Sequence, residues 1–457
     1  MTDYSAQLGT ERIPNLLIKM SAPAMVGLLV QAMYNLTDTI FVGRGVGSLA
    51  IAGITISFPV QILVMAIAQT FGIGCSSIVS RSLGAGDYAH ANRTLGNLFT
   101  LVALLSAAIA VLGSLYIAPL LRLFGASDVV LPFARDYLRI ILIGSPFFMF
   151  AMSTSAVIRA EGNARVAMWT MIISGVLNIV LDPLFIYGFR MGIRGAALAT
   201  VLAQATTVIY VIYYFAGGRS GLRTKFSDLL LNLKIVRESF AIGAGSFARM
   251  VAGSLTVIIL NNTLGTYGGD TAIAAFGVVN RMLNFVFLPL FGVVQGMLPI
   301  VGFNYGAGRI DRVRDVLRAS IWVTTAMSLA SAALLAAIPR QLLQIFTNDP
   351  ALIDMGVTAT RVVVVAFPTV GFQVIAGGMY QALGRAMPAF VLAILRQVLL
   401  LTPLVLLLPG LMGLSGVWIS FPISDGGAAV VTAIMLFVSL RWLKSRDQGE
   451  LQPAETT

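Results

Sequence analysis

Cysteine, histidine and charge are scarce in this chain of 457 residues. It contains one cysteine, Cys75, and one histidine, His90. A disulfide framework and a His/Cys cluster for a structural metal are therefore excluded, and we expect no cofactor. An enzyme built on a Cys–His or Ser–His–Asp arrangement would also lack its base, so we do not expect an enzyme.

Charged residues make up 11% of the chain and hydrophobic residues 58%, whereas soluble proteins have roughly 25% charged residues. These values argue against a water-soluble protein. The net charge of +11 would suggest a nucleic-acid partner in a soluble protein. In a membrane protein it more often reflects Arg and Lys in cytoplasmic loops, so no nucleic-acid partner is expected.

Long apolar segments recur along the whole chain. A membrane-spanning helix needs roughly 20 mostly apolar residues. The sequence predicts an all-α polytopic membrane protein with twelve such helices, over residues 20–42, 49–79, 95–121, 134–157, 166–189, 195–216, 239–264, 271–300, 319–338, 356–380, 387–410 and 413–440. The N-terminal residues do not resemble a cleaved signal peptide, so we expect the first span to be retained.

The basic residues predict the orientation. When both termini are placed in the cytoplasm, nineteen Arg and Lys residues lie in loops or span ends on that side and six on the other. This asymmetry follows the positive-inside rule. We therefore expect a multi-pass protein of the cytoplasmic (inner) membrane, in contact with lipid and with both termini cytoplasmic.

The chain contains an internal repeat. An offset of 222 residues aligns Gly84-Ala85-Gly86 with Gly306-Ala307-Gly308, and it also aligns Ala50-Ile51-Ala52 with Ala272-Ile273-Ala274. Six spans return the chain to its starting side, so the two halves are parallel repeats. We predict an N-lobe over residues 1–216, a cytoplasmic linker with an interfacial stretch over 217–238, a C-lobe over 239–441 and a cytoplasmic tail over 442–457.

Two parallel six-helix bundles are typical of a secondary transporter with a central cavity and alternating access. The alternative is that the duplicated bundle serves as a channel or a scaffold. No Walker motif is present, so nothing in the sequence indicates that ATP drives transport.

Intramembrane carboxylates indicate where such a transporter would bind an ion. Asp38 and Asp182 both lie roughly 7 to 11 Å below the outer end of a span, so they share a depth. Asn178 lies one turn before Asp182, and Thr200 and Gln204 share a face of the next helix. We predict an oxygen-rich pocket in the N-terminal half.

This pocket permits two mechanisms. Burial and a neighbouring carboxylate favour the protonated form, which would allow proton coupling. Alternatively, both carboxylates stay ionised around Na⁺, in which case Asp38, Asn178 and Asp182 would be metal ligands. A third interpretation is that each Asp only pairs with an intramembrane Arg.

The C-terminal half lacks the same residues. The 222-residue offset places Leu260 at the position of Asp38, with Asn261 beside it. We therefore expect cation coupling to be concentrated in the N-terminal half. Arg281 is expected near the cytoplasmic end or on the cavity wall, with either a gating or a packing role. Asp425 and Arg396 are expected to pair with each other rather than to take part in transport.

Several motifs, and their order along the chain, resemble those of the multidrug and toxic compound extrusion (MATE) transporters. The likeness extends from about Pro14 to Arg441. The motifs that carry it are Asn35-Leu-Thr-Asp38-Thr-Ile-Phe41-Val42-Gly43, Leu83-Gly-Ala-Gly86-Asp87, Arg159-Ala-Glu-Gly162-Asn163, Asn178-Ile-Val-Leu-Asp182-Pro183, Gly195-Ala-Ala-Leu-Ala-Thr200 and Tyr305-Gly-Ala-Gly308-Arg309. The pattern is similar to the DinF-type branch of that family.

The resemblance implies two six-helix lobes in a V and efflux of organic, often cationic, drugs in exchange for Na⁺ or H⁺. The branch's cation-coupling residues would be Asp38, Asn178, Asp182 and Thr200. The predicted substrate cavity includes Tyr34, Tyr137, Gln204, Asn261 and Arg281. We expect a monomer. The alternative is a lipid-linked oligosaccharide or lipid flippase of the related superfamily.

Overall fold

The computed structural model describes residues 4–447, and this part of the chain is helical with no strand. Long apolar segments form helices because a helix satisfies its own backbone hydrogen bonds in lipid. The first half contains α1 (Tyr4–Thr10), α2 (Ile13–Gly45), α3 (Ser48–Gly84), α4 (Tyr88–Leu115), α5 (Ile117–Leu123), α6 (Leu131–Ala160), α7 (Ala164–Pro183), the π-helix η1 (Leu184–Gly188) and α8 (Ile193–Ala216).

The second half begins after a connecting segment that holds the short helix η2. Its elements are η2 (Phe226–Leu229), α9 (Leu233–Gly306), α10 (Ile310–Ala337), α11 (Pro339–Gln344), α12 (Pro350–Val363), η3 (Val364–Thr369), α13 (Val370–Ala382), α14 (Ala386–Ile394), η4 (Leu395–Leu401), α15 (Thr402–Leu407), α16 (Pro409–Met412) and α17 (Leu414–Asp447).

Eleven helical segments of the described chain are long and apolar enough to cross a membrane. One of them, α9, has 74 residues, which would extend over roughly 110 Å if it were a single straight helix. Its backbone is non-helical at Gly269, where φ is +65° and two helices meet at a kink. Counted as two spans, α9 brings the total to the predicted twelve.

One predicted span is longer than the helix that forms. The apolar pattern predicted a helix over 95–121, but α4 ends at Leu115 and the separate helix α5 begins at Ile117. At Tyr116, between them, φ is −105° and ψ is +21°. Apolar residues continue through α5, so the hydropathy pattern carried no sign of this break.

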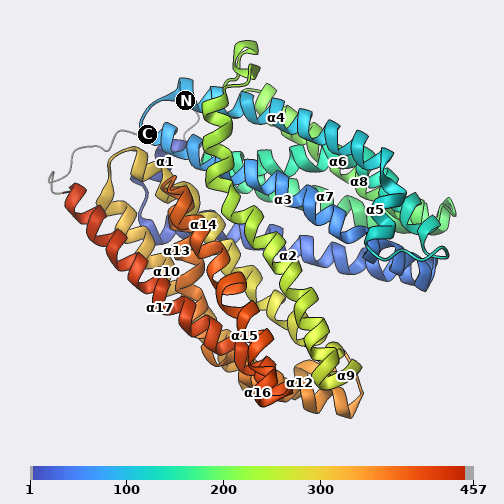
Figure 1. The fold of residues 1–457 in the computed structure, drawn as a ribbon. Helices are drawn as coiled ribbons and strands as arrows, with labels where there is room; N and C mark the ends of the chain where they lie inside the picture. Colours follow the sequence, from blue (N-terminus) through green and yellow to red (C-terminus); the bar gives the residue numbers. More distant parts are fainter. Residues whose placement is uncertain (1–3, 448–457) are drawn as a thin grey trace.

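The helices form two bundles that meet near the two chain termini and diverge toward the opposite end, giving a V (Figure 1). Helices α2 and α3 of the first half pack on α9 of the second. A buried cluster at this junction combines Leu16 and Met20 with Met297 and Ile300. The predicted all-α fold with two parallel six-helix lobes is confirmed.

Two glycines bring the lobes into backbone contact where α3 meets α9. A Cβ placed on Gly84 would lie 1.9 Å from the carbonyl oxygen of Phe303, and one placed on Gly306 would lie 1.9 Å from that of Arg81. Both pairs obey the 222-residue offset, because Gly84 corresponds to Gly306 and Arg81 to Phe303. The contact is therefore reciprocal between the two repeats.

The connection between the two bundles runs from the end of α8 to the start of α9. Helix α8 ends at Ala216 and α9 begins at Leu233. Between and beside them, Phe226 (90%) and Leu233 (79%) are strongly exposed, as an interfacial stretch requires. Helix α17 runs to Asp447 and buries Leu443, so the predicted tail starts within this helix. Residues 448–457 of that tail lie outside the described residues.

Candidate functional site

Asn178 connects the polar side chains of α7 and α8. Its amide nitrogen Nδ2 donates to Oδ1 of Asp182 at 3.3 Å and to the hydroxyl of Thr200 at 3.2 Å. The Thr200 hydroxyl in turn donates to the Ala196 carbonyl at 3.1 Å. Asn178 and Asp182 are buried, with 1% and 0% of their surface exposed. Their spacing of four residues places them on one face of α7, as the sequence predicted.

Asp38 approaches this group from α2. Its carboxyl group is close enough to that of Asp182 to interact with it electrostatically. The hydroxyl groups of Tyr34 and Tyr137 also interact with the Asp38 charge. The structure therefore brings together Asp38, Asn178, Asp182 and Thr200.

Three oxygens of this group are buried and accept no hydrogen bond from residues 4–447. They are Oδ1 of Asp38, Oδ2 of Asp182 and Oδ1 of Asn178. A buried acceptor without a donor is costly, and carboxylate and amide oxygens suit a hard cation. The residues thus fit a bound Na⁺ or a proton shared between the carboxylates. Within the described residues, no three His, Cys, Asp or Glu side chains lie close enough together to hold a metal ion.

A cavity of about 210 Å³ lies beside these residues. Its lining includes Asp38 and Thr200 and also Tyr34, Tyr137 and Gln204, three of the five residues predicted to line a substrate cavity. Phe58, Ile62, Met65, Ile141 and Phe148 supply apolar walls. A mixture of apolar walls and a few polar groups is typical of a small-molecule site.

A second cavity, of about 130 Å³, continues from the first toward the junction of the lobes. Gln31, Tyr34, Phe148 and Gln204 line both cavities. Gln295, on α9 of the second lobe, lines the second cavity. The two cavities together make a chamber that lies mainly in the first lobe.

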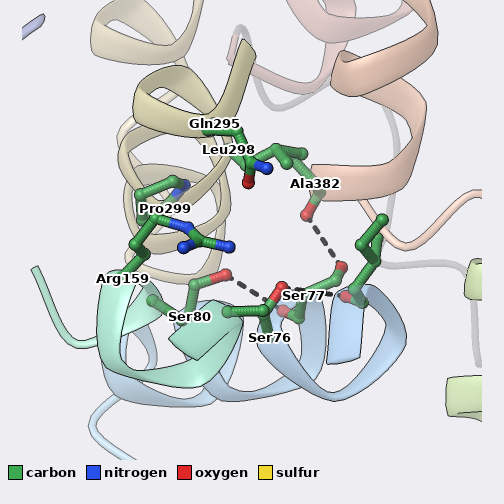
Figure 2. A pocket seen from close by; sticks show the side chains of 11 residues that line it. Ser76, Ser77, Ser80, Arg159, Gln295, Leu298, Pro299 and Ala382 are labelled. Carbon is green, nitrogen blue, oxygen red and sulfur yellow. Dashed lines mark hydrogen bonds between the residues drawn. The ribbon is translucent and has the colours of Figure 1, made fainter. Parts of the chain in front are cut away.

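The chamber ends at a narrow polar pocket between the lobes. Arg159, Ser76, Ser80 and Gln295 line this pocket (Figure 2). Close by, the Ser77 hydroxyl donates to the carbonyl of Gln381 at 2.5 Å, which joins α3 to α13. The lobes are therefore closed against each other at this end of the chamber.

The backbone of α7 changes directly after Asp182. Pro183 directly follows Asp182, and the chain then forms the π-helix η1 over Leu184–Gly188. Proline lacks an N–H and so removes one α-helical hydrogen bond. After Asp182 and Pro183 the chain therefore continues as a π-helical segment and not as a regular α-helix.

The remaining predicted residues lie apart from this chamber. Asn261 is half-buried and Arg281 is exposed, both on α9, and neither lines the cavities described above. Arg396 pairs with Asp425 through two hydrogen bonds, one of them 3.3 Å from Nη2 to Oδ2. The expected pairing of these two residues is present.

Several lining residues were not singled out from the sequence. Gln31 and Asn35 line the larger cavity together with the predicted Tyr34 and Asp38, and the spacing of i, i+3, i+4 and i+7 places all four on one face of α2. This regular spacing of polar residues in an apolar helix could have predicted from the sequence that they share a cavity. Gln61 and Ser145, on α3 and α6, carried no such pattern.

Two repeated membrane helix bundles, with two neighbouring carboxylates inside the first and a chamber beside them, are typical of a membrane transporter. The MatE family model matches residues 23–184 and 239–407. The chain therefore belongs to the MATE transporter family, as the sequence motifs indicated. The two matched segments leave out the connection between the lobes.

Similar proteins agree with this family. The multidrug export protein MepA of Staphylococcus aureus (strain NCTC 8325 / PS 47) is 27% identical over 432 residues, covering 94% of this chain and 95% of that protein. The solved structure of the MATE multidrug transporter DinF-BH is 42% identical, with a TM-score of 0.89 over 96% of this chain and 98% of that chain. An outward-facing MATE transporter of the MOP superfamily is 27% identical, with a TM-score of 0.92 over 97% of this chain and 100% of that chain.

Proposed function

We propose that this transporter is a secondary active antiporter of the inner membrane that exports organic, often cationic, compounds in exchange for H⁺ or Na⁺. The observation that carries the proposal is the cluster of three buried oxygens without a hydrogen-bond donor, on Asp38, Asn178 and Asp182, beside a chamber with apolar walls and a few polar groups. A cation that binds there satisfies those oxygens, and its release leaves negative charge available to an organic cation.

Each residue has a defined role in this exchange. Asp38 and Asp182 supply the charge that the inorganic cation neutralises. Asn178 orients the group, because its amide nitrogen holds Asp182 and Thr200. Tyr34, Tyr137 and Gln204 line the chamber that would receive the organic compound.

The contact between the lobes supports alternating access. The lobes touch at the end that holds both termini and diverge at the other (Figure 1). With the termini in the cytoplasm, this arrangement closes the chamber to the inside. Loading and unloading of the cation would then shift the balance between this shape and one that opens inward.

Charge-neutralising variants test the proposal. In proteoliposomes, Asp38→Asn and Asp182→Asn should each reduce ion-driven export of a fluorescent organic cation to the level of empty vesicles, because each removes a charge that the coupling ion must neutralise. Asp128→Asn is the matched control, since Asp128 is a loop carboxylate with 93% of its side chain exposed, and it should export normally. Full export by both chamber variants would reject the assignment.

The same vesicles identify the coupling ion. Export is measured first under an imposed Na⁺ gradient without a pH gradient, and then under a pH gradient without Na⁺. The gradient that drives export in the wild-type protein, and fails to do so in Asp182→Asn, defines the ion.

A further inference from the structure

A separate cavity lies at the end of the first lobe that holds the N-terminus, away from the chamber. It has a volume of about 450 Å³, within the range of ligand pockets. Its lining includes Tyr4, Asn163, Tyr210, Tyr213, Tyr214 and Arg219. These residues come from α1, the turn between α6 and α7, the last turns of α8 and the start of the connection between the lobes.

The polar groups of this cavity suit an anion. Arg219 is the one charged side chain among its described lining residues. Its guanidinium lies over the Tyr213 ring, 4.7 Å from the centroid, and donates to the Tyr213 hydroxyl at 2.9 Å. The guanidinium is also close enough to Tyr210 to interact with it electrostatically. The remaining N–H donors of the Arg219 guanidinium and the tyrosine hydroxyls suit the oxygens of a phosphate group.

The surroundings of the cavity suit a lipid rather than a free anion. Tyr210 and Tyr213 lie in the last two turns of the span formed by α8, at the depth where a headgroup meets the acyl chains. Ile209 and Ile212 on the same helix are 68% and 52% exposed. Apolar surface for acyl chains therefore adjoins a basic, hydroxyl-lined hollow.

We propose that this cavity binds the phosphate-bearing headgroup of an anionic phospholipid. Tyrosines at the membrane surface often serve only as interfacial anchors, but here four tyrosines surround one hollow that also contains an arginine. An aromatic cage for an organic cation is disfavoured, because Arg219 occupies one wall. Basic pockets at the cytoplasmic ends of membrane helices are known to hold anionic headgroups.

Native mass spectrometry of the full-length protein tests this site. The purified protein is titrated with phosphatidylglycerol and, separately, with phosphatidylcholine. Wild-type protein should retain phosphatidylglycerol preferentially, and Arg219→Gln should weaken that binding about five-fold, the effect of one basic residue on an anionic lipid. Tyr210→Phe, which removes one hydroxyl and keeps the ring, should weaken it to a smaller extent.

Arg223→Gln is the matched control, because Arg223 is an exposed arginine of the same connection and does not line the cavity. It should bind phosphatidylglycerol like the wild type. Equal losses in Arg219→Gln and Arg223→Gln, or no preference for phosphatidylglycerol, would overturn the proposal. Displacement by equimolar inorganic phosphate would show a site for free anions and would also overturn it. These measurements do not involve transport, so their outcome is independent of the proposed export activity.

Discussion

At the scale of one residue, a substitution of Thr200 tests the proposed ion site through a partial loss of export. Thr200→Val keeps the shape of the side chain and removes the oxygen that accepts from Asn178. A hydrogen bond of this kind contributes about 1 kcal/mol, so we expect export at sub-saturating ion concentration to fall about five-fold. That loss is smaller than for Asp182→Asn, because the site keeps both charges.

Thr206 on the same helix is the control for this change. Both hydroxyls donate to the carbonyl four residues earlier, Thr206 to Leu202 and Thr200 to Ala196, but Thr206 is exposed. Thr206→Val should therefore export normally. Equal effects of the two substitutions would mean that the loss comes from the helix and not from the site.

Glu161 is a buried carboxylate in the turn between α6 and α7, with 3% of its surface exposed. Its Oε2 accepts from the Ser220 hydroxyl at 2.6 Å and from the Gly221 N–H at 2.9 Å. These bonds fasten the connection between the lobes to the first lobe. Burial raises the pKa of Glu161 from 4.5 to about 7, against the opposing effect of these hydrogen bonds.

The raised pKa predicts a pH-dependent stability. Between about pH 4.5 and 7 the folded protein holds a proton on Glu161 that the unfolded chain has released, so this residue's contribution to the free energy of unfolding falls as the pH rises. Glu161→Gln cannot titrate and keeps an acceptor for Ser220. The Tm of the wild type relative to Glu161→Gln should therefore decline from pH 5 to 7 and level off by about pH 8. A Tm difference that is constant from pH 5 to 8 would contradict this.

The sequence predicts local side-chain relations better than distant ones. Asn178 and Asp182 share a helix face because of their spacing, and the repeated polar spacing in α2 was visible in the same way. Gln61 and Ser145 reach the chamber from α3 and α6. Their place depends on how those helices rotate and pack, which no periodicity within either segment specifies.

At the scale of helices, Gly306 tests how the lobes touch. In Gly306→Ala the new Cβ would collide with the backbone of Arg81, where no side chain can move aside. Overpacking of this kind costs about 2 kcal/mol, which would shift the ratio of closed to separated lobe ends roughly thirty-fold. Spin labels on the exposed Ala89 and Asp311, at the starts of α4 and α10, should report a larger population at long distance.

Gly277→Ala is the control for this substitution on the same helix. Apart from its chain neighbours and the nearby backbone of its own helix, no atom of the described chain lies within 4 Å of a Cβ placed on Gly277. The label distances should therefore match those of the parent protein. Cys75 is buried and should not take up label. Unchanged distances in Gly306→Ala would show that this contact does not hold the lobes together.

Helix boundaries were predictable where turn chemistry coincided with the end of an apolar run. Asn163, for example, accepts from the N–H of Val166 and caps α7. The break at Tyr116 falls within apolar sequence and went undetected. The kink at Gly269 falls in the segment Gly265-Thr-Tyr-Gly-Gly-Asp270, between the predicted spans 239–264 and 271–300.

For the whole molecule, the predicted orientation in the membrane can be tested directly. The positive-inside rule places the connection between the lobes in the cytoplasm and residues 124–130 outside. In cells, the Arg223→Cys variant should not react with an impermeant thiol reagent added from outside. The Asp128→Cys variant should react with it. The reverse pattern would invert the predicted orientation.

The overall architecture was the most predictable feature. Twelve apolar segments and a single repeat offset restrict the chain to two like bundles, because each half must satisfy its backbone within the membrane. The angle between the bundles was not predictable in the same way. It depends on a few close contacts between the lobes, such as those of Gly84 and Gly306, whose partners lie more than two hundred residues away.

The reciprocity of that glycine contact bears on how such a chain can originate. Each half offers the other the same glycine and the same carbonyl, which is the form of an isologous interface between two copies of one subunit. An unduplicated six-helix ancestor would thus already carry a surface able to pair with itself about a two-fold axis. Gene fusion would then join two copies and allow one of them to keep Asp38 and Asp182 while the other has leucine, Leu260 and Leu404, at the corresponding positions.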